Sequence, residues 1–86
     1  MDTVDDKVIR WRCRRGMKEL DVILERFLHH GYEYLTTADK AAFSQLLGAL
    51  DPDLFHWLTG KGLPEEPVLQ NIVRLVRAKV ESKAPP

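Results

Sequence analysis

The single cysteine of the chain, Cys13, lies among cationic side chains and is the first candidate for chemistry. Neighbours such as Arg12 and Arg14 can lower the pKa of a thiol and so favour the nucleophilic thiolate. A nucleophile also needs a base and a group that orients the base, and no such pair stands out nearby in the sequence. We therefore interpret Cys13 as a small residue at the end of a helix. Because it is the only cysteine, a disulfide within the chain is excluded.

Two adjacent histidines, His29 and His30, are the next candidates because imidazole is a common metal ligand. Zinc takes three or four protein ligands, and useful pairs on a helix lie three or four residues apart. Glu33 can lie near these histidines, but a closing set of ligands is missing. We interpret both as polar residues that suit the last carbonyls of a helix, and we predict no metal site. Glycine-rich phosphate loops and hydrolase motifs are also missing, so the chain is predicted not to be an enzyme.

A cluster of cations near the N-terminus is more informative. It consists of Lys7, Arg10, Arg12, Arg14, Arg15 and Lys18. The whole chain carries 13 basic and 13 acidic residues, so the excess is local and can steer a partner. The alternatives are a solvated charged face and a nucleic-acid surface of the helix-turn-helix type. Glu19, Asp21 and Glu25 follow at once and would repel phosphates, so a protein partner is favoured over a nucleic acid.

Within this cluster, the stretch 15–19 combines a glycine with two opposite charges. Gly16 lacks a side chain, so the backbone of another protein can approach there. Arg15 offers a planar fork for a carboxylate or a carbonyl, and Glu19 lies four residues on, within reach on one helix face. The alternative is a turn glycine beside a surface ion pair worth about 0–1 kcal/mol. Both interpretations stay open from the residues alone.

The elements that must position these residues are helices. The apolar pattern predicts five of them, over about residues 4–14, 17–30, 37–50, 52–59 and 66–81. Thr3 is expected to cap the first helix, and Val4, Val8 and Trp11 to form its core stripe. That stripe is about 120° out of phase with the one that starts at Met17. Since a glycine inside a helix costs about 1 kcal/mol, we place a break at residues 14–16.

Turn and cap residues mark the other boundaries. Gly31 is expected to end the second helix in the left-handed conformation, and Thr36 to cap the third. Asp51 is expected to cap the fourth helix and Gly60 to end it. The predicted core of the last four helices consists of Met17, Leu20, Leu24, Phe27, Leu28, Phe43, Leu46, Leu47, Leu50, Leu54, Phe55, Trp57, Leu58, Val68 or Leu69, Ile72, Val73, Val76 and Val80. This pattern predicts an all-α fold without a sheet.

The length of 86 residues predicts a single domain over residues 1–86 with one modest core and little room for a deep substrate cavity. The N-terminus is acidic, whereas secretory and mitochondrial signals are basic or poor in acids. No apolar run approaches the about 18 residues of a membrane span. We therefore expect a cytoplasmic protein without membrane insertion, either a bacterial protein or a mature form.

Two segments resemble the signature of the succinate dehydrogenase FAD assembly factor family. They read Trp-Arg-Cys-Arg-Arg-Gly-Met-Lys-Glu-Leu-Asp at 11–21 and Asp-Pro-Asp-Leu-Phe-His-Trp-Leu at 51–58. The resemblance implies a compact five-helix domain with a Y-like outline. It also implies a factor that promotes covalent attachment of FAD to the flavoprotein subunit of succinate dehydrogenase, and of the related fumarate reductase. In that reaction a histidine of the flavoprotein bonds to the 8α-methyl carbon of the flavin.

The same resemblance implies which residues meet the flavoprotein. The family motif is carried by Arg15, Gly16 and Glu19. Further partner-binding candidates surround it: Arg14, Lys18 and Asp21. The second segment also matches at Phe55 and Trp57, and one or both of these are expected in the core. No cofactor is expected to be held stably, because FAD belongs to the partner, and direct contact with FAD is left open. Members of this family are also described as antitoxins. A small nucleic-acid-binding or antitoxin-like regulator is therefore the alternative function.

Overall fold

The computed structural model describes residues 6–81, and within them the chain is helical, as predicted. The elements are α1 (Asp6–Arg12), α2 (Lys18–His30), a short 3-10 turn η1 (Tyr32–Tyr34), α3 (Thr37–Leu46), α4 (Asp51–Leu58) and α5 (Pro67–Glu81). No strand occurs among the described residues. The predicted all-α class with five α-helices is confirmed for this part of the chain.

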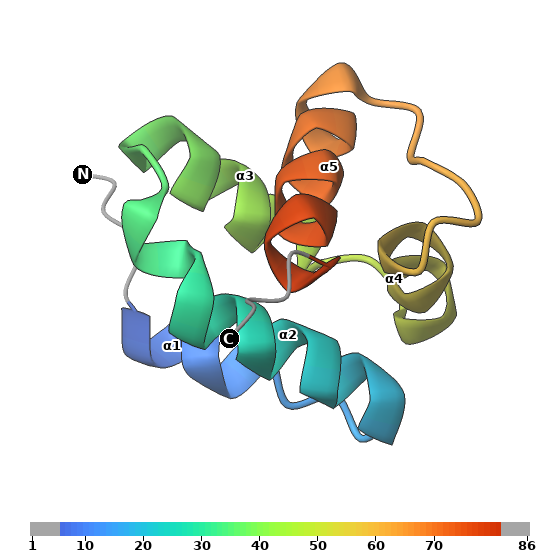
Figure 1. The fold of residues 1–86 in the computed structure, drawn as a ribbon, viewed down its shortest axis with the longest axis horizontal. Coiled ribbons are helices and arrows are strands. Elements are labelled where there is room, and N and C mark those ends of the chain that lie inside the picture. Colours follow the sequence, from blue (N-terminus) through green and yellow to red (C-terminus); the bar gives the residue numbers. More distant parts are fainter. Residues whose placement is uncertain (1–5, 82–86) are drawn as a thin grey trace.

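The helices form two levels around one apolar core. Figure 1 shows α1 and α2 along the bottom of the view, α3 and α5 above them, and α4 at the right-hand end. The last helix, α5, packs on α2, α3 and α4 and so closes the core. None of the helices among residues 6–81 is long and apolar enough to cross a membrane.

The centre of the core is aromatic. The ring centroids of Phe27 and Phe43 lie 5.1 Å apart, and those of Tyr32 and Phe43 lie 5.7 Å apart. Tilted ring pairs at such distances are worth about 0.5–1.5 kcal/mol beyond their buried area. Aliphatic residues from α2, α3, α4 and α5 complete the core: Leu20, Leu24, Leu46, Leu47, Leu54, Leu58, Ile72, Val73 and Val76. These nine were all predicted from the periodicity of the sequence, whereas Tyr32 was not.

The core stripe predicted for α1 is wrong. Val8 is 48% exposed and Trp11 is 76% exposed, whereas Ile9 is fully buried and Cys13 is 4% exposed. Residues 9 and 13 are four apart and so share one face of the helix, which turns by about 100° per residue and carries Val8 and Trp11 outward. In a helix of only seven residues, the apolar periodicity fits the face of Val8 and Trp11 as well as that of Ile9 and Cys13. Periodicity alone therefore could not identify the buried face. The predicted Val4 and the cap Thr3 lie outside the described residues.

The predicted break between the first two helices is confirmed. α1 ends at Arg12 and α2 begins at Lys18, and Gly16 between them has a φ of +91°. That left-handed conformation is open to glycine and strained for residues with a Cβ atom. The chain therefore reverses between α1 and α2 at this glycine. The phase difference suggested by the sequence does not mark the break, because the buried Cys13 is only about 40° out of line with Met17.

Two of the predicted caps differ from the structure. Gly31 has a φ of −137°, which is not left-handed; an added Cβ there would lie 2.7 Å from the Phe27 ring, so close packing explains this glycine. Asp51 is the first residue of α4 rather than its cap, and Leu50 precedes it without a side-chain cap. The Thr36 cap is confirmed, because its hydroxyl accepts the N–H of Asp39 at 3.0 Å.

The ends of α3 and α4 explain the remaining differences. α3 ends at Leu46 rather than at residue 50, and Leu50 is 72% exposed instead of buried because the chain has left the helix before it. Phe55 and Trp57 are half-buried against the core, which agrees with the expectation that one or both contribute to it. Gly60 follows α4 with a φ of +87°, so the predicted glycine end of that helix is confirmed.

Candidate partner-binding site

Arg15 lies at the junction between α1 and α2 and makes most of its side-chain hydrogen bonds. Its side chain is 14% exposed, and its Nε donates to Asp51 Oδ1 at 2.8 Å. Its Nη1 donates to the carbonyls of Arg12 at 3.0 Å and Leu47 at 2.9 Å, and its Nη2 to that of Ala49 at 2.8 Å. The guanidinium fork therefore recognises a carboxylate and carbonyls, as its chemistry suggests, but these belong to its own chain.

The ion pair expected between Arg15 and Glu19 is accordingly replaced by the one with Asp51. Spacing along a helix favours partners four residues apart, but Arg15 precedes α2 and is not on its surface. The α3–α4 connection offers several acceptors at once, including a carboxylate. That Arg15 itself contacts a partner stays a prediction, and its side chain is mainly used within the fold.

Asp21 holds the backbone of the junction from the other side. Its two carboxylate oxygens accept the N–H of Arg15 at 2.7 Å and the N–H of Gly16 at 3.3 Å. A carboxylate that accepts backbone N–H groups makes a charge-assisted hydrogen bond, which is stronger than a neutral one. Arg15, Gly16 and Asp21, which the sequence analysis grouped, are thus one hydrogen-bonded unit.

Gly16 itself faces open space. An added Cβ would meet nothing within 4 Å, and the residue is exposed. The left-handed φ explains why the fold needs glycine, and the open surface leaves room for the backbone of another protein. Arg14, Lys18 and Glu19 are exposed close to it in the chain, on the linker and the first turn of α2.

The sequence analysis missed Arg12 and Asp51 as parts of this junction. Arg12 donates to the hydroxyl and the carbonyl of Ser44, at 2.9 and 3.0 Å, and so ties α1 to α3. The available signal for Asp51 was that the second segment of the family signature begins there. Nothing in the local sequence pairs Ser44 with Arg12, which lies 32 residues away.

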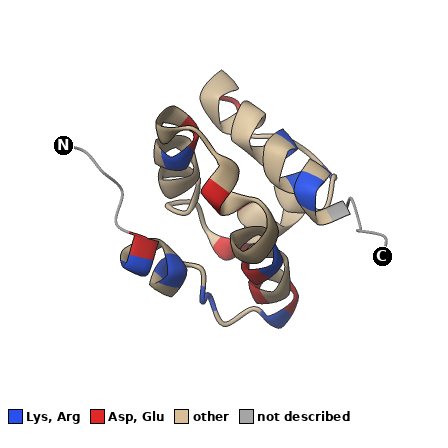
Figure 2. Cartoon of the chain, turned by 60° about the vertical axis from the view of Figure 1, so that its left-hand side comes forward, with Lys and Arg blue, Asp and Glu red and all other residues tan. Residues whose placement is uncertain are grey.

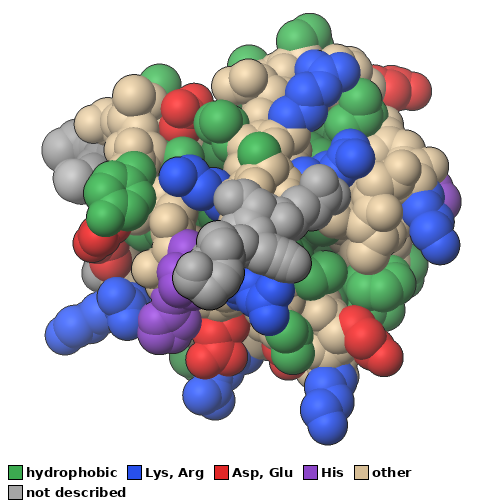
Figure 3. Space-filling view, viewed as in Figure 1, with side chains coloured by type: hydrophobic (Ala, Val, Ile, Leu, Met, Phe, Trp, Pro, Cys, Tyr) green, Lys and Arg blue, Asp and Glu red, His purple; other side chains and the backbone are tan. Residues whose placement is uncertain are grey.

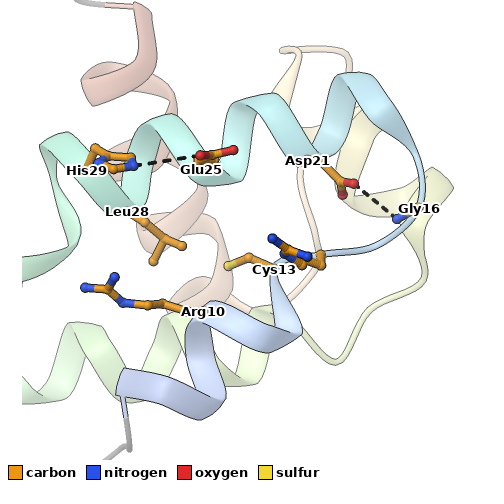
Figure 4. A pocket seen from close by; sticks show the side chains of 8 residues that line it. Arg10, Cys13, Gly16, Asp21, Glu25, Leu28 and His29 are labelled. Atoms are coloured by element: carbon orange, nitrogen blue, oxygen red, sulfur yellow. Dashed lines mark hydrogen bonds and ion pairs between the residues drawn. The ribbon is translucent and has the colours of Figure 1, made fainter.

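A groove of about 610 Å³ runs between α1 and α2 and reaches Gly16. Figure 4 shows Arg10 and Cys13 on the α1 side, with Glu25, Leu28 and His29 on α2, and Gly16 at one end. His29 Nε2 lies 3.8 Å from Glu25 Oε2, and both side chains are exposed on α2. One wall of the groove carries cations and the other carries carboxylates. Such a groove suits a polypeptide with both positive and negative side chains better than it suits a polyphosphate.

The Cys13 thiol, which lines this groove, is not activated as a nucleophile. Burial raises its pKa to about 12, although Arg15 and Arg12 act in the opposite direction. Desolvation therefore outweighs the arginine effect that the sequence suggested, and the group stays a neutral thiol at physiological pH. This supports the interpretation of Cys13 as a packing residue.

Charges of both signs lie side by side in the two views of the described residues (Figure 2 and Figure 3). Figure 2 shows basic and acidic positions mixed along the helices, and Figure 3 shows the same mixture on one face of the surface. In the described part of the chain, no three His, Cys, Asp or Glu side chains come together as a metal site would need. The junction and its groove are therefore the most distinctive polar feature in residues 6–81.

The fold and the junction define a small all-helical protein whose opening two helices present a glycine held in place by an arginine and an aspartate. A sequence model of the family described as the flavinator of succinate dehydrogenase matches residues 7–80. The chain belongs to this family, whose description is that of a factor acting on another enzyme rather than of an enzyme with its own substrate.

Bacterial relatives agree along nearly the whole chain. The chain is 41% identical to the FAD assembly factor SdhE of Pectobacterium atrosepticum, over 95% of its own length and 94% of that protein. It is 40% identical to FAD assembly factors SdhE from a Serratia species, over 99% and 97%, and from Yersinia pseudotuberculosis, over 95% and 94%. The resemblance inferred from residues 11–21 and 51–58 is confirmed.

Proposed function

We propose that the chain is an assembly factor that binds the flavoprotein subunit of succinate dehydrogenase and promotes covalent attachment of FAD to a histidine of that subunit. Its family and the names of its relatives support this activity. The flavoprotein of fumarate reductase is proposed as a second partner. The structural observation that carries the proposal is the hydrogen-bonded junction in which Gly16 is open to solvent.

The proposed interface combines Gly16 with the exposed charges around it. Arg14, Lys18 and Glu19 would meet groups of the flavoprotein, while Arg15 and Asp21 hold the junction in the shape that the partner meets. A factor that must leave after assembly suits a modest, charge-rich interface, because such charges speed association more than they slow release. The groove beside Gly16 offers such an interface.

The proposed mechanism is a shift of conformational population. The new bond joins the flavin to the flavoprotein, so this chain need not supply a reacting group. It would bind best to the flavoprotein conformation in which FAD and the histidine are aligned, and so enrich that conformation. FAD remains the cofactor of the partner, the site of action is the bacterial cytoplasm, and neither a nucleic acid nor membrane insertion is involved.

Covalent flavin on the flavoprotein tests the function and its site together. The flavoprotein subunit is produced with the wild-type chain or with Gly16→Arg, and covalent flavin is measured by in-gel fluorescence. We expect the wild type to raise covalent flavin and Gly16→Arg to lose most of that effect, because the new side chain fills the approach to the junction.

Gly60→Arg is the control for backbone strain, since Gly60 is also exposed with a left-handed φ of +87°, beyond α4. A Cβ there would also lie 3.1 Å from Arg77 Nη2, whereas one at Gly16 meets nothing within 4 Å, so the control strains the fold at least as much. A folded Gly60→Arg variant should keep the activity. Equal flavinylation with a folded Gly16→Arg variant would refute the site, and no effect of the wild type would refute the function.

A retardation assay addresses the alternative of a nucleic-acid-binding regulator. That function predicts binding to DNA or RNA that weakens steeply with salt. We expect no retardation at physiological salt, because Asp21 and Glu25 line the same groove as the cations Arg10 and Arg14. Retardation that Arg10→Glu or Arg14→Glu abolishes would favour the regulator instead.

A further inference from the structure

The most exposed of the large apolar side chains in residues 6–81 is Trp11, at 76%. Val8, one turn earlier on α1, is 48% exposed. A single exposed apolar residue is ordinary on a protein surface. Trp11 differs because an indole carries about 150–250 Å² of surface and because the next residue, Arg12, is hydrogen-bonded to Ser44.

Beside the indole lies a depression of about 410 Å³, lined by Trp11, Arg12, Arg14 and Arg15. Two of its three guanidinium groups are used within the fold: Arg12 on Ser44 and Arg15 on Asp51. These bonds fix Arg12, which directly follows Trp11 in the chain, and Arg15, which directly follows Arg14. Arg14, by contrast, is exposed, so it is the cation of this depression that faces solvent.

The depression and the groove at the junction share one lining residue. Arg14 lines both of them, and the groove reaches Gly16. A partner that covers Gly16 and Arg14 would need to extend only past Arg14 to reach the depression beside Trp11. The exposed stripe of α1, which periodicity alone would assign to the core, lies on the edge of the proposed flavoprotein interface.

We propose that Trp11 and Arg14 anchor this interface, with the indole covering an apolar recess of the flavoprotein and the guanidinium pairing with a carboxylate at its rim. Tryptophan and arginine are the side chains most enriched at energetically dominant interface positions. Arg12, the residue next to Trp11, is held by Ser44, which lowers the entropic cost of ordering this part of the chain on binding. The charge of Arg14 selects an acidic rim. This inference rests on the proposed function and names the chemistry of its partner surface.

The first test measures the affinity of the chain for the purified flavoprotein subunit of succinate dehydrogenase. Trp11→Ala is expected to weaken binding by about 30-fold or more, the loss typical of a dominant interface tryptophan. Arg14→Glu should slow association, and the difference from wild type should shrink at high salt. The matched control is Tyr34→Ala, which removes a 72% exposed aromatic ring on η1 and should change affinity less than about twofold.

A second measurement uses the wild-type fold and so does not depend on the stability of a variant. Both tryptophans are replaced biosynthetically by 5-fluorotryptophan, and Trp11→Phe assigns the two fluorine signals. Trp57 is half-buried in the core and serves as the internal reference. Adding the flavoprotein should shift the Trp11 signal and remove its sensitivity to D₂O, while the Trp57 signal stays in place.

The outcomes separate this inference from the function itself. If the wild-type chain does not bind the flavoprotein, the proposed function fails. If it binds, but Trp11→Ala binds equally well and the Trp11 signal does not move, only the anchor is overturned. Self-association of the wild-type chain that Trp11→Ala abolishes would show that this face meets a second copy of the chain, which also overturns the anchor.

Discussion

Arg15 and Asp51 are joined by an ion pair of 2.8 Å across 36 residues of sequence. Each lies in one of the two segments that carry the family signature, 11–21 and 51–58. The pair therefore makes these segments one structural unit, in which the α3–α4 connection supports the junction between α1 and α2. Part of the signature specifies the shape of the proposed interface rather than contacts with the partner.

Asp51→Asn is expected to destabilise the fold through this pair. The substitution leaves a mostly buried guanidinium without its carboxylate, and the loss of such a partner costs about 1–3 kcal/mol. Urea denaturation followed by far-UV circular dichroism measures the free energy of unfolding. Asp53→Asn is the control, since it removes an exposed carboxylate from the same first turn of α4. Equal destabilisation by the two variants would assign the effect to the helix dipole and not to Arg15.

Asp21→Ala is expected to loosen the junction locally. The N–H groups of Arg15 and Gly16 lose their acceptor, so their amide hydrogens should exchange faster while those in the core of α5 stay protected. Flavinylation should fall with it, because the flavoprotein would then have to order the junction on binding. Native-state hydrogen exchange by NMR measures the first effect. Unchanged protection of the Arg15 amide would contradict the role given to Asp21.

Sequence periodicity predicted the helices well where they are long. In α2 and α5, of 13 and 15 residues, several turns repeat the same apolar face, and the buried residues Leu20, Leu24, Ile72 and Val76 were all expected. In α1, with seven residues, Val8–Trp11 and Ile9–Cys13 compete as stripes, and only the packing against the core decides between them. Periodicity contains no information about which face the rest of the chain covers.

The site shows the same division between local and distant information. Gly16 and its break were predicted because the cost of a glycine inside a helix is a local property of the chain, whereas the phase difference used beside it came from the wrong stripe of α1. The ion pair to Asp51 was missed because the α3–α4 connection comes to Arg15 through the tertiary fold. Asp51 was instead assigned to a helix cap, a role that its local sequence suggests and that its actual position as the first residue of α4 does not allow.

The Cys13 thiol is expected to make the stability of the fold depend on alkaline pH. Burial raises its pKa from 9.0 to about 12, so above pH 9 the unfolded chain loses a proton that the folded chain retains. The unfolded state then binds fewer protons, and the free energy of unfolding falls as pH rises from about 9 toward 12. Tyr32, whose pKa burial and Asp6 raise from 10.0 to about 12, adds to the same slope above pH 10. Urea denaturation at pH 8, 9 and 10 measures how the free energy of unfolding depends on pH. Cys13→Ala should lose the part of this slope between pH 9 and 10. Flavinylation by this variant at neutral pH should stay unchanged. An equal slope in both proteins would contradict the burial of this thiol, and loss of flavinylation by a folded Cys13→Ala variant would give the thiol a role beyond packing.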